Sequence, residues 1–184
     1  MKPGDCFLMK GATKEKPMTI YLIDDFKGEK LYAYALYVGD NMIQGLDYPM
    51  QYDNNIPPDA VILPKDTYSK AKELMKAFVK EAHCYIRENI IGGDVVIEMG
   101  KRYYDYRVAI NVVKKIKEGR VYYETFRIDE ENISPYWKGE ANIDVLIDSW
   151  RPIPEYVYQE ILSRYKRLLR NLREYMFNPL VELI

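Results

Sequence analysis

The chain has 184 residues, of which 48% are hydrophobic, and it carries 27 basic and 28 acidic side chains. These values are typical of a globular protein with enough apolar residues for a core, and a net charge of -1 lacks the bias that nucleic-acid and membrane-surface proteins usually show. Its 2 cysteines are too few for a disulfide scaffold.

Residues 1–90 predict a set of short strands followed by a helix. The strands are apolar runs with aromatic and β-branched residues: Cys6–Met9, Met18–Ile23, Leu31–Val38 and Ala60–Leu63. A hairpin turn is expected over Asp24–Glu29, where Gly28 can supply a positive φ. The Gly-, Asp-, Asn- and Pro-rich stretch 44–59 predicts a long loop with at most one short strand. Beyond Pro64, apolar residues at spacings of three and four predict a helix over 65–88.

Residues 91–184 predict a similar series. The expected strands are Val95–Glu98, Tyr106–Val113, Val121–Ile128 and, as the last, Asp144–Ile147. A turn is expected at Lys117–Gly119. After Pro154 an apolar stripe, broken only by Arg164, predicts a helix over 155–177.

The two halves also share landmark residues in the same order, at offsets of 89 to 91 positions. The pairs are Gly4 and Gly93, Gly28 and Gly119, Asn41 and Asn132, Pro64 and Pro154, Tyr68 and Tyr158, and Tyr85 and Tyr175. A period near ninety residues is too long for a solenoid and predicts a duplicated domain, 1–90 and 91–184, without a flexible linker. The predicted fold is α+β, with two tandem repeats, each a small antiparallel SH3-like β-barrel or bent sheet followed by a long amphipathic C-terminal helix.

Catalytic residues are not indicated. His83 is the only histidine, and its helical neighbour Cys84 diverges from it by about 100°, which excludes a dyad between them. Because His83 also lies away from the centre of the apolar stripe, we expect a surface or inter-domain histidine. The carboxylates at 24–25 and 129–131 are explained without a catalytic role, because acidic side chains are common in turns, where they accept hydrogen bonds from the backbone. We therefore expect a protein that is not an enzyme, with no catalytic residue, cofactor or metal.

Protein binding is the favoured function because the chain has 18 Tyr, a residue enriched at contact hot spots. Tyr136 and Trp137 follow Pro135 in a predicted loop, and they are the best candidates for exposed anchors. Trp150, Tyr103 and Tyr104 are further candidates. The expected class is a non-enzymatic interaction module of the scaffold or toxin-neutralising type, with an unknown protein partner.

Nucleic-acid binding is the alternative, through the basic and aromatic segment 101–120 and the basic face of the last helix. The residues concerned are Lys101, Arg102, Arg107, Lys166, Arg170 and Arg173. Interspersed acidic residues and the balanced charge make this function less favoured than protein binding.

The termini bear on location and assembly. Neither a signal-peptide pattern nor a membrane-spanning apolar run is visible, so we expect a cytoplasmic protein that does not bind membranes. The apolar tail Leu180–Ile184 follows Pro179, and we expect it to dock against the first copy or to form a homodimer contact.

Overall fold

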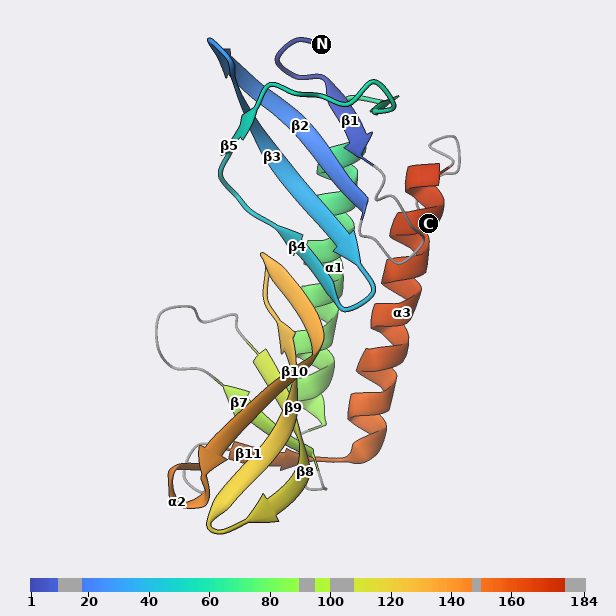
Figure 1. Cartoon of the computed structure of the whole chain (residues 1–184). Coiled ribbons are helices and arrows are strands. Elements are labelled where there is room, and N and C mark those ends of the chain that lie inside the picture. Colours follow the sequence, from blue (N-terminus) through green and yellow to red (C-terminus); the bar gives the residue numbers. More distant parts are fainter. Residues whose placement is uncertain (10–17, 90–94, 100–107, 147–149, 178–184) are drawn as a thin grey trace. The chain divides into compact units, whose positions relative to one another are not determined.

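The computed structural model describes residues 1–9, 18–89, 95–99, 108–146 and 150–177. The chain divides into two compact units. Unit 1 comprises Met1–Met75 and Arg167–Ile184, and unit 2 comprises Lys76–Lys166. Figure 1 shows two long helices, α1 (Thr67–Glu88) and α3 (Glu155–Phe177). Each contributes residues to both units.

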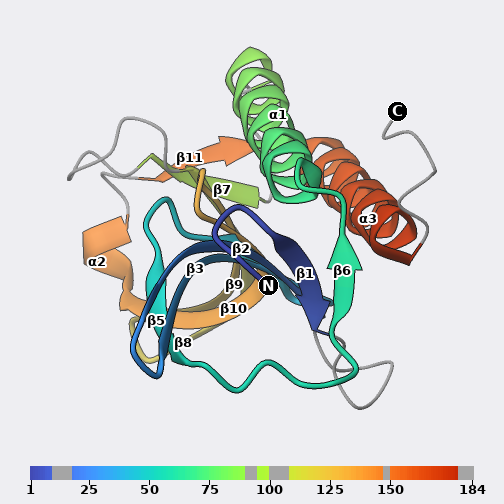
Figure 2. The ribbon, with the colours of Figure 1, turned by 90° about the horizontal axis from the view of Figure 1, so that it is seen from above.

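Unit 1 is built on an antiparallel sheet. Its strands are β1 (Cys6–Met9), β2 (Met18–Lys27), β3 (Lys30–Gly39), β4 (Met42–Gly45), β5 (Met50–Asp53) and β6 (Val61–Leu63). Hydrogen-bonded neighbours follow the order β6-β1-β2-β3-β4, and β5 pairs with the first residues of β3. Figure 2 shows β6 alongside β1, where Leu63 lies opposite Cys6.

Both faces of the unit 1 sheet carry buried side chains. Cys6 and Leu8 on β1 point to one face and Phe7 to the other, and all three are buried. Phe7 clusters with Ile23, Leu31 and Ala33 beneath partly buried residues that include Tyr21, Tyr52 and Ile56. Burial raises the pKa of the Cys6 thiol to about 11, so this cysteine is a packing residue, as its place in a strand predicts.

Unit 2 contains a second antiparallel series. Its elements are β7 (Val95–Met99), β8 (Val108–Lys117), β9 (Arg120–Ile128), β10 (Asn132–Asn142), the short helix α2 (Ile143–Leu146) and β11 (Trp150–Ile153). The order is β11-β7-β8-β9-β10. Phe126 of β9 meets the α3 ring of Tyr165 edge-on at 5.5 Å, and Phe78 of α1 meets it at 6.4 Å, so these three rings join the sheet to both helices.

The predicted fold class is wrong. The strands form open antiparallel sheet rather than SH3-like barrels, because among the described residues neither β6-β1-β2-β3-β4 nor β11-β7-β8-β9-β10 closes on its first strand. The chain is also not two repeats that each own a helix. The boundaries between the units fall inside α1, after Met75, and inside α3, after Lys166, so each helix serves both units.

Local predictions had mixed outcomes. The strand at Cys6–Met9 and both long helices are confirmed. The last strand of the second half is not Asp144–Ile147, since Ile143–Leu146 forms α2 and the strand is Trp150–Ile153. The hairpin turn expected over Asp24–Glu29 is shorter, because β2 continues to Lys27 through a register shift between Ile23 and Asp25.

Arg164 does not disrupt the packing of α3, although it breaks the apolar stripe. Its guanidinium lies 4.6 Å from the centroid of the Tyr85 ring, and its Nε donates to Glu160 at 2.7 Å. The long side chain thus covers an aromatic ring while its charge stays paired. Within the described residues, no helix is sufficiently long and apolar to cross a membrane.

Candidate functional site

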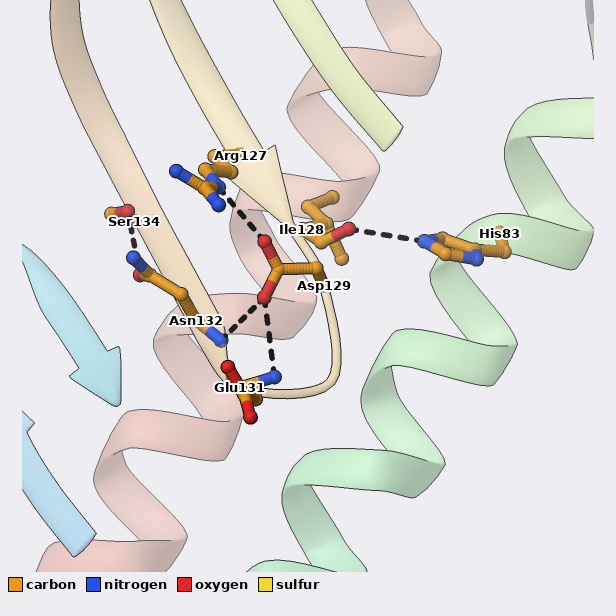
Figure 3. Close-up of polar contacts among 7 residues, drawn as sticks. All are labelled: His83, Arg127, Ile128, Asp129, Glu131, Asn132 and Ser134. Atoms are coloured by element: carbon orange, nitrogen blue, oxygen red, sulfur yellow. Dashed lines mark hydrogen bonds and ion pairs between the residues drawn. The ribbon is translucent and has the colours of Figure 1, made fainter. Parts of the chain in front are cut away.

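The turn between β9 and β10 is held by the side chain of Asp129 (Figure 3). Its Oδ1 accepts hydrogen bonds from the backbone N–H groups of Asn132 at 2.7 Å and Glu131 at 3.1 Å. Its Oδ2 accepts from Nε of Arg127 at 2.8 Å, and Ser134 Oγ donates to Asn132 Oδ1 at 2.8 Å. The prediction that Asp129 is a turn residue is therefore confirmed. Its hydrogen bonds hold the first residues of β10 in place.

His83 is buried against the same turn. Its side chain is 5% exposed, and Nε2 lies 3.1 Å from the carbonyl oxygen of Ile128. Of the two expected positions, surface or inter-domain, the surface position is wrong, because the end of β9 covers this side of α1. Burial lowers the pKa of His83, and Arg87 acts in the same direction, against the opposing effects of the Ile128 carbonyl, Asp129 and Glu130. His83 is therefore a neutral donor that ties α1 to β9.

This burial predicts a loss of stability in acid. The unfolded chain binds a proton at His83 near the ordinary pKa of 6.5, whereas the folded chain takes it up only at lower pH. The stability contributed by neutral His83 is thus fully present above pH 6.5 and is lost as the pH falls from there towards the folded pKa. Urea unfolding over a pH series measures this loss. In His83→Gln, whose amide nitrogen can take the place of Nε2, the free energy of unfolding should fall less steeply over that interval, and equal slopes would contradict the assignment.

A β-bulge interrupts β10 just beyond this turn. The pairing of β10 with β9 shifts register between Ser134 and Trp137, and Trp137 then lies opposite Thr125. At the bulge Tyr136 has a φ of 72°, which is the left-handed region that bulky residues avoid. The side chains of Tyr136 and Trp137 are 44% and 58% exposed. These two residues, the aromatic pair, thus lie in a strand and not in the loop predicted for them.

Tyr136 acts electrostatically on a second tyrosine, Tyr158, together with two carboxylates. The pKa of Tyr158 on α3 is raised, first by burial and then by its neighbours Tyr136, Glu124 and Glu155. Glu124 forms an ion pair with Lys114 at 2.9 Å. Glu155 accepts a hydrogen bond from Gln159 at 2.6 Å. Tyr136 of β10, Glu124 of β9 and Glu155 in the first turn of α3 therefore all act electrostatically on the half-buried phenol of Tyr158.

Only some of the other candidate binding residues lie in the part of the chain that the structure describes. Lys166 and Arg170 are exposed on α3, whereas Arg173 forms an ion pair with Asp40 at 2.6 Å. Of Trp150 the structure describes the backbone, which pairs with Glu98. Five candidates, as well as the apolar tail, lie outside the described residues: Lys101, Arg102, Tyr103, Tyr104 and Arg107.

Sequence reasoning missed the part that Tyr158, Glu124 and Glu155 play here. In the sequence Tyr158 is a landmark of the repeat and a member of the apolar stripe of the last helix, and the two glutamates are far from Tyr136 in sequence. One available signal was Pro135, since proline inside a strand is found mostly at edges and bulges. Among the described side chains, no group of three or more His, Cys, Asp and Glu could hold a metal ion.

Comparison with known proteins adds no assignment. No protein-family model, curated protein or solved structure matches this chain. Function is therefore inferred from the residues themselves.

Proposed function

We propose that this protein is a non-enzymatic protein-binding module whose contact surface is centred on the aromatic pair, Tyr136 and Trp137. Tyrosine and tryptophan dominate the energetics of protein interfaces because a large ring buries much apolar area at a low cost in side-chain entropy. Trp137 is the larger anchor and is more than half exposed. A partner that covered it would remove that apolar surface from water.

The backbone conformation of Tyr136 is the observation that carries this proposal. A non-glycine residue in the left-handed region costs about 1–2 kcal/mol. A buried ring could offset that cost through packing, but the Tyr136 ring is 44% exposed and recovers only part of it. Glycine would fit this bulge without the strain. A bulky aromatic residue here is therefore poorly explained by fold stability, and strain of this kind clusters at functional positions.

Tyr136→Gly tests the proposal directly. The substitution should relieve backbone strain of about 1–2 kcal/mol. Glycine also gives the unfolded chain extra freedom, which costs about 0.5–1 kcal/mol. The free energy of unfolding should therefore stay unchanged or rise slightly. Partner binding should be lost at the same time. The measurements are urea unfolding and capture from an extract of the native cells on immobilised wild-type and variant protein, quantified by mass spectrometry.

Two further variants complete this experiment. Trp137→Ala should also abolish capture of any partner that depends on Tyr136. Tyr48→Ala should leave capture unchanged, because Tyr48 is equally exposed but lies in unit 1 between β4 and β5. Equal capture by wild type, Tyr136→Gly and Trp137→Ala would refute the proposal. A stability loss well above 1 kcal/mol in Tyr136→Gly would instead assign the ring a structural role.

Nucleic-acid binding has less support from the described side chains. One of its six candidate residues, Arg173, is already paired with a carboxylate of this chain. Lys166 and Arg170 form the exposed basic face expected of an amphipathic helix.

A further inference from the structure

The unit 1 sheet ends at a strand whose outer edge is open. β6 has β1 on one side and, within the described residues, no strand on the other (Figure 2). Backbone N–H and C=O groups at such an edge can pair with a further strand. β6 is short, Val61–Leu63, and Pro64 follows it directly. Because Pro64 has no N–H to donate, only a few residues of β6 can take part in such pairing.

The side chains at this edge are apolar and exposed on both faces of the sheet. Ile62 is 68% exposed, more than Trp137 at 58%, and Val61 is 39% exposed. Ile62 lies opposite Phe7 of β1, so these two side chains share a face, and Phe7 belongs to the buried cluster of unit 1. Val61 lies opposite the buried Leu8 on the other face. β6 therefore extends the apolar surface of both faces to the open edge.

The residues that flank β6 carry opposite charges at equal distances from its centre. Asp59 precedes Ile62 by three positions and Lys65 follows it by three, and both charged residues are exposed. When two identical strands pair antiparallel around Ile62, Asp59 of each copy faces Lys65 of the other. Val61 then faces Leu63, and the two copies of Ile62 meet at the centre. The segment 59–65 is thus complementary to itself in charge and in apolar character.

We propose that β6 is a self-association edge, to which a second copy of this chain adds its own β6 in antiparallel orientation, centred on Ile62. This inference concerns unit 1 and does not depend on the proposed function. Antiparallel pairing of identical strands has two-fold symmetry, so every contact occurs twice. The pairing occupies the open β6 edge of both copies, and it therefore produces a dimer and not a filament.

The flanking charges favour one register of this pairing. A shift of one residue would place Asp59 opposite Pro64, or Lys65 opposite Ala60, and would leave the charges without partners. Such a shift would also place Ile62 opposite a residue whose side chain belongs to the other face. An extended peptide from another protein would gain the same backbone hydrogen bonds. The matched spacing of Asp59 and Lys65 favours the second copy over such a peptide.

A contact of this size is expected to be weak. The 3 residues of β6 bury far less surface than the roughly 1,600 Å² of a standard stable interface. We expect reversible dimerisation with a Kd between about 1 µM and 1 mM. Sedimentation velocity of the full chain over a concentration series reaching about 1 mM measures it. A chain that stays monomeric over the whole series would overturn the inference.

Ile62→Lys should weaken dimerisation about tenfold or more, because like charges would face each other at the centre of the pair. Ile116→Lys is the matched control, since Ile116 is 62% exposed but lies on β8 of unit 2. This control should dimerise like the wild type. Both substitutions are at exposed positions, so the urea midpoints should equal that of the wild type. Equal dimerisation of Ile62→Lys and the wild type would overturn the inference.

A charge exchange tests the register. Asp59→Lys and Lys65→Asp should each weaken self-association about three- to tenfold, because each turns two attractive pairs into two repulsive ones. A mixture of the two variants should form heterodimers, since opposite charges then face each other at both ends of the pair. The double variant should regain the Kd of the wild type. If neither the mixture nor the double variant associates better than the single variants, the second copy is not the occupant of this edge.

Discussion

Phe126→Ala is expected to lower the free energy of unfolding by about 3–5 kcal/mol, the usual cost of truncating a buried phenylalanine. Phe126 is 1% exposed and meets the ring of Tyr165 edge-on at 5.5 Å. Its removal leaves a cavity between β9 and α3, because Tyr165 is also held by Phe78 and cannot move into the space freely. Urea unfolding monitored by circular dichroism measures the loss.

Two variants check the origin of this effect. Phe126→Leu keeps most of the volume and should cost about 1 kcal/mol, chiefly for the edge-on contact. Ile116→Ala on the neighbouring strand β8 should change the stability by less than about 0.5 kcal/mol, since Ile116 is largely exposed. If Phe126→Ala were no more costly than Ile116→Ala, the three rings would not form the core of unit 2.

Elements with strong local signals could be predicted from the sequence. The long helices repeat apolar residues over about six turns, and Pro154 marks the start of α3 at Glu155. Cys6–Met9 and Val121–Ile128 are apolar, aromatic or β-branched runs and form strands as expected. In these segments, periodicity and propensity agree with the tertiary structure.

Elements with mixed local signals could not be predicted. The strand β10 contains Pro135 and Gly139 and has no apolar alternation, so its sequence reads as a loop. It forms a strand because β9 pairs with it over most of its length and a bulge accommodates the break in register at Pro135 and Tyr136. The strand predicted at Asp144–Ile147 is wrong for a different reason: a short apolar run does not distinguish a strand from a turn of helix, and residues Ile143–Leu146 form α2.

The candidate site needed three-dimensional information. Exposed aromatic residues could be proposed from composition, but the positive φ of Tyr136 depends on the bulge in β10, and the effect of Glu124, Tyr136 and Glu155 on the Tyr158 phenol depends on how β9, β10 and α3 meet. A small barrel or bent sheet is what four or five short strands followed by a helix predict. Strand number does not determine closure, which depends on tilt and register across the whole sheet.

Asp129→Ala should be the most damaging change in the β9–β10 turn, with a loss of about 2–3 kcal/mol. Asp129 accepts two backbone N–H bonds, and its other oxygen accepts from Arg127 at 2.8 Å. Alanine leaves all three donors without this acceptor. Because this turn sets the first residues of β10, the change should also disorder the bulge and weaken partner binding through Tyr136 and Trp137.

Asp129→Asn separates the charge from the turn. Its side-chain carbonyl can still accept the N–H groups of Glu131 and Asn132, so the turn and partner binding should persist. The ion pair with Arg127 is lost, and since that pair is only partly buried we expect a cost of about 1 kcal/mol or less. Urea unfolding and the capture assay applied to both variants give the comparison. If Asn were as damaging as Ala, the negative charge rather than the hydrogen bonds to the backbone would hold the turn, and the bulge would depend on Arg127 instead.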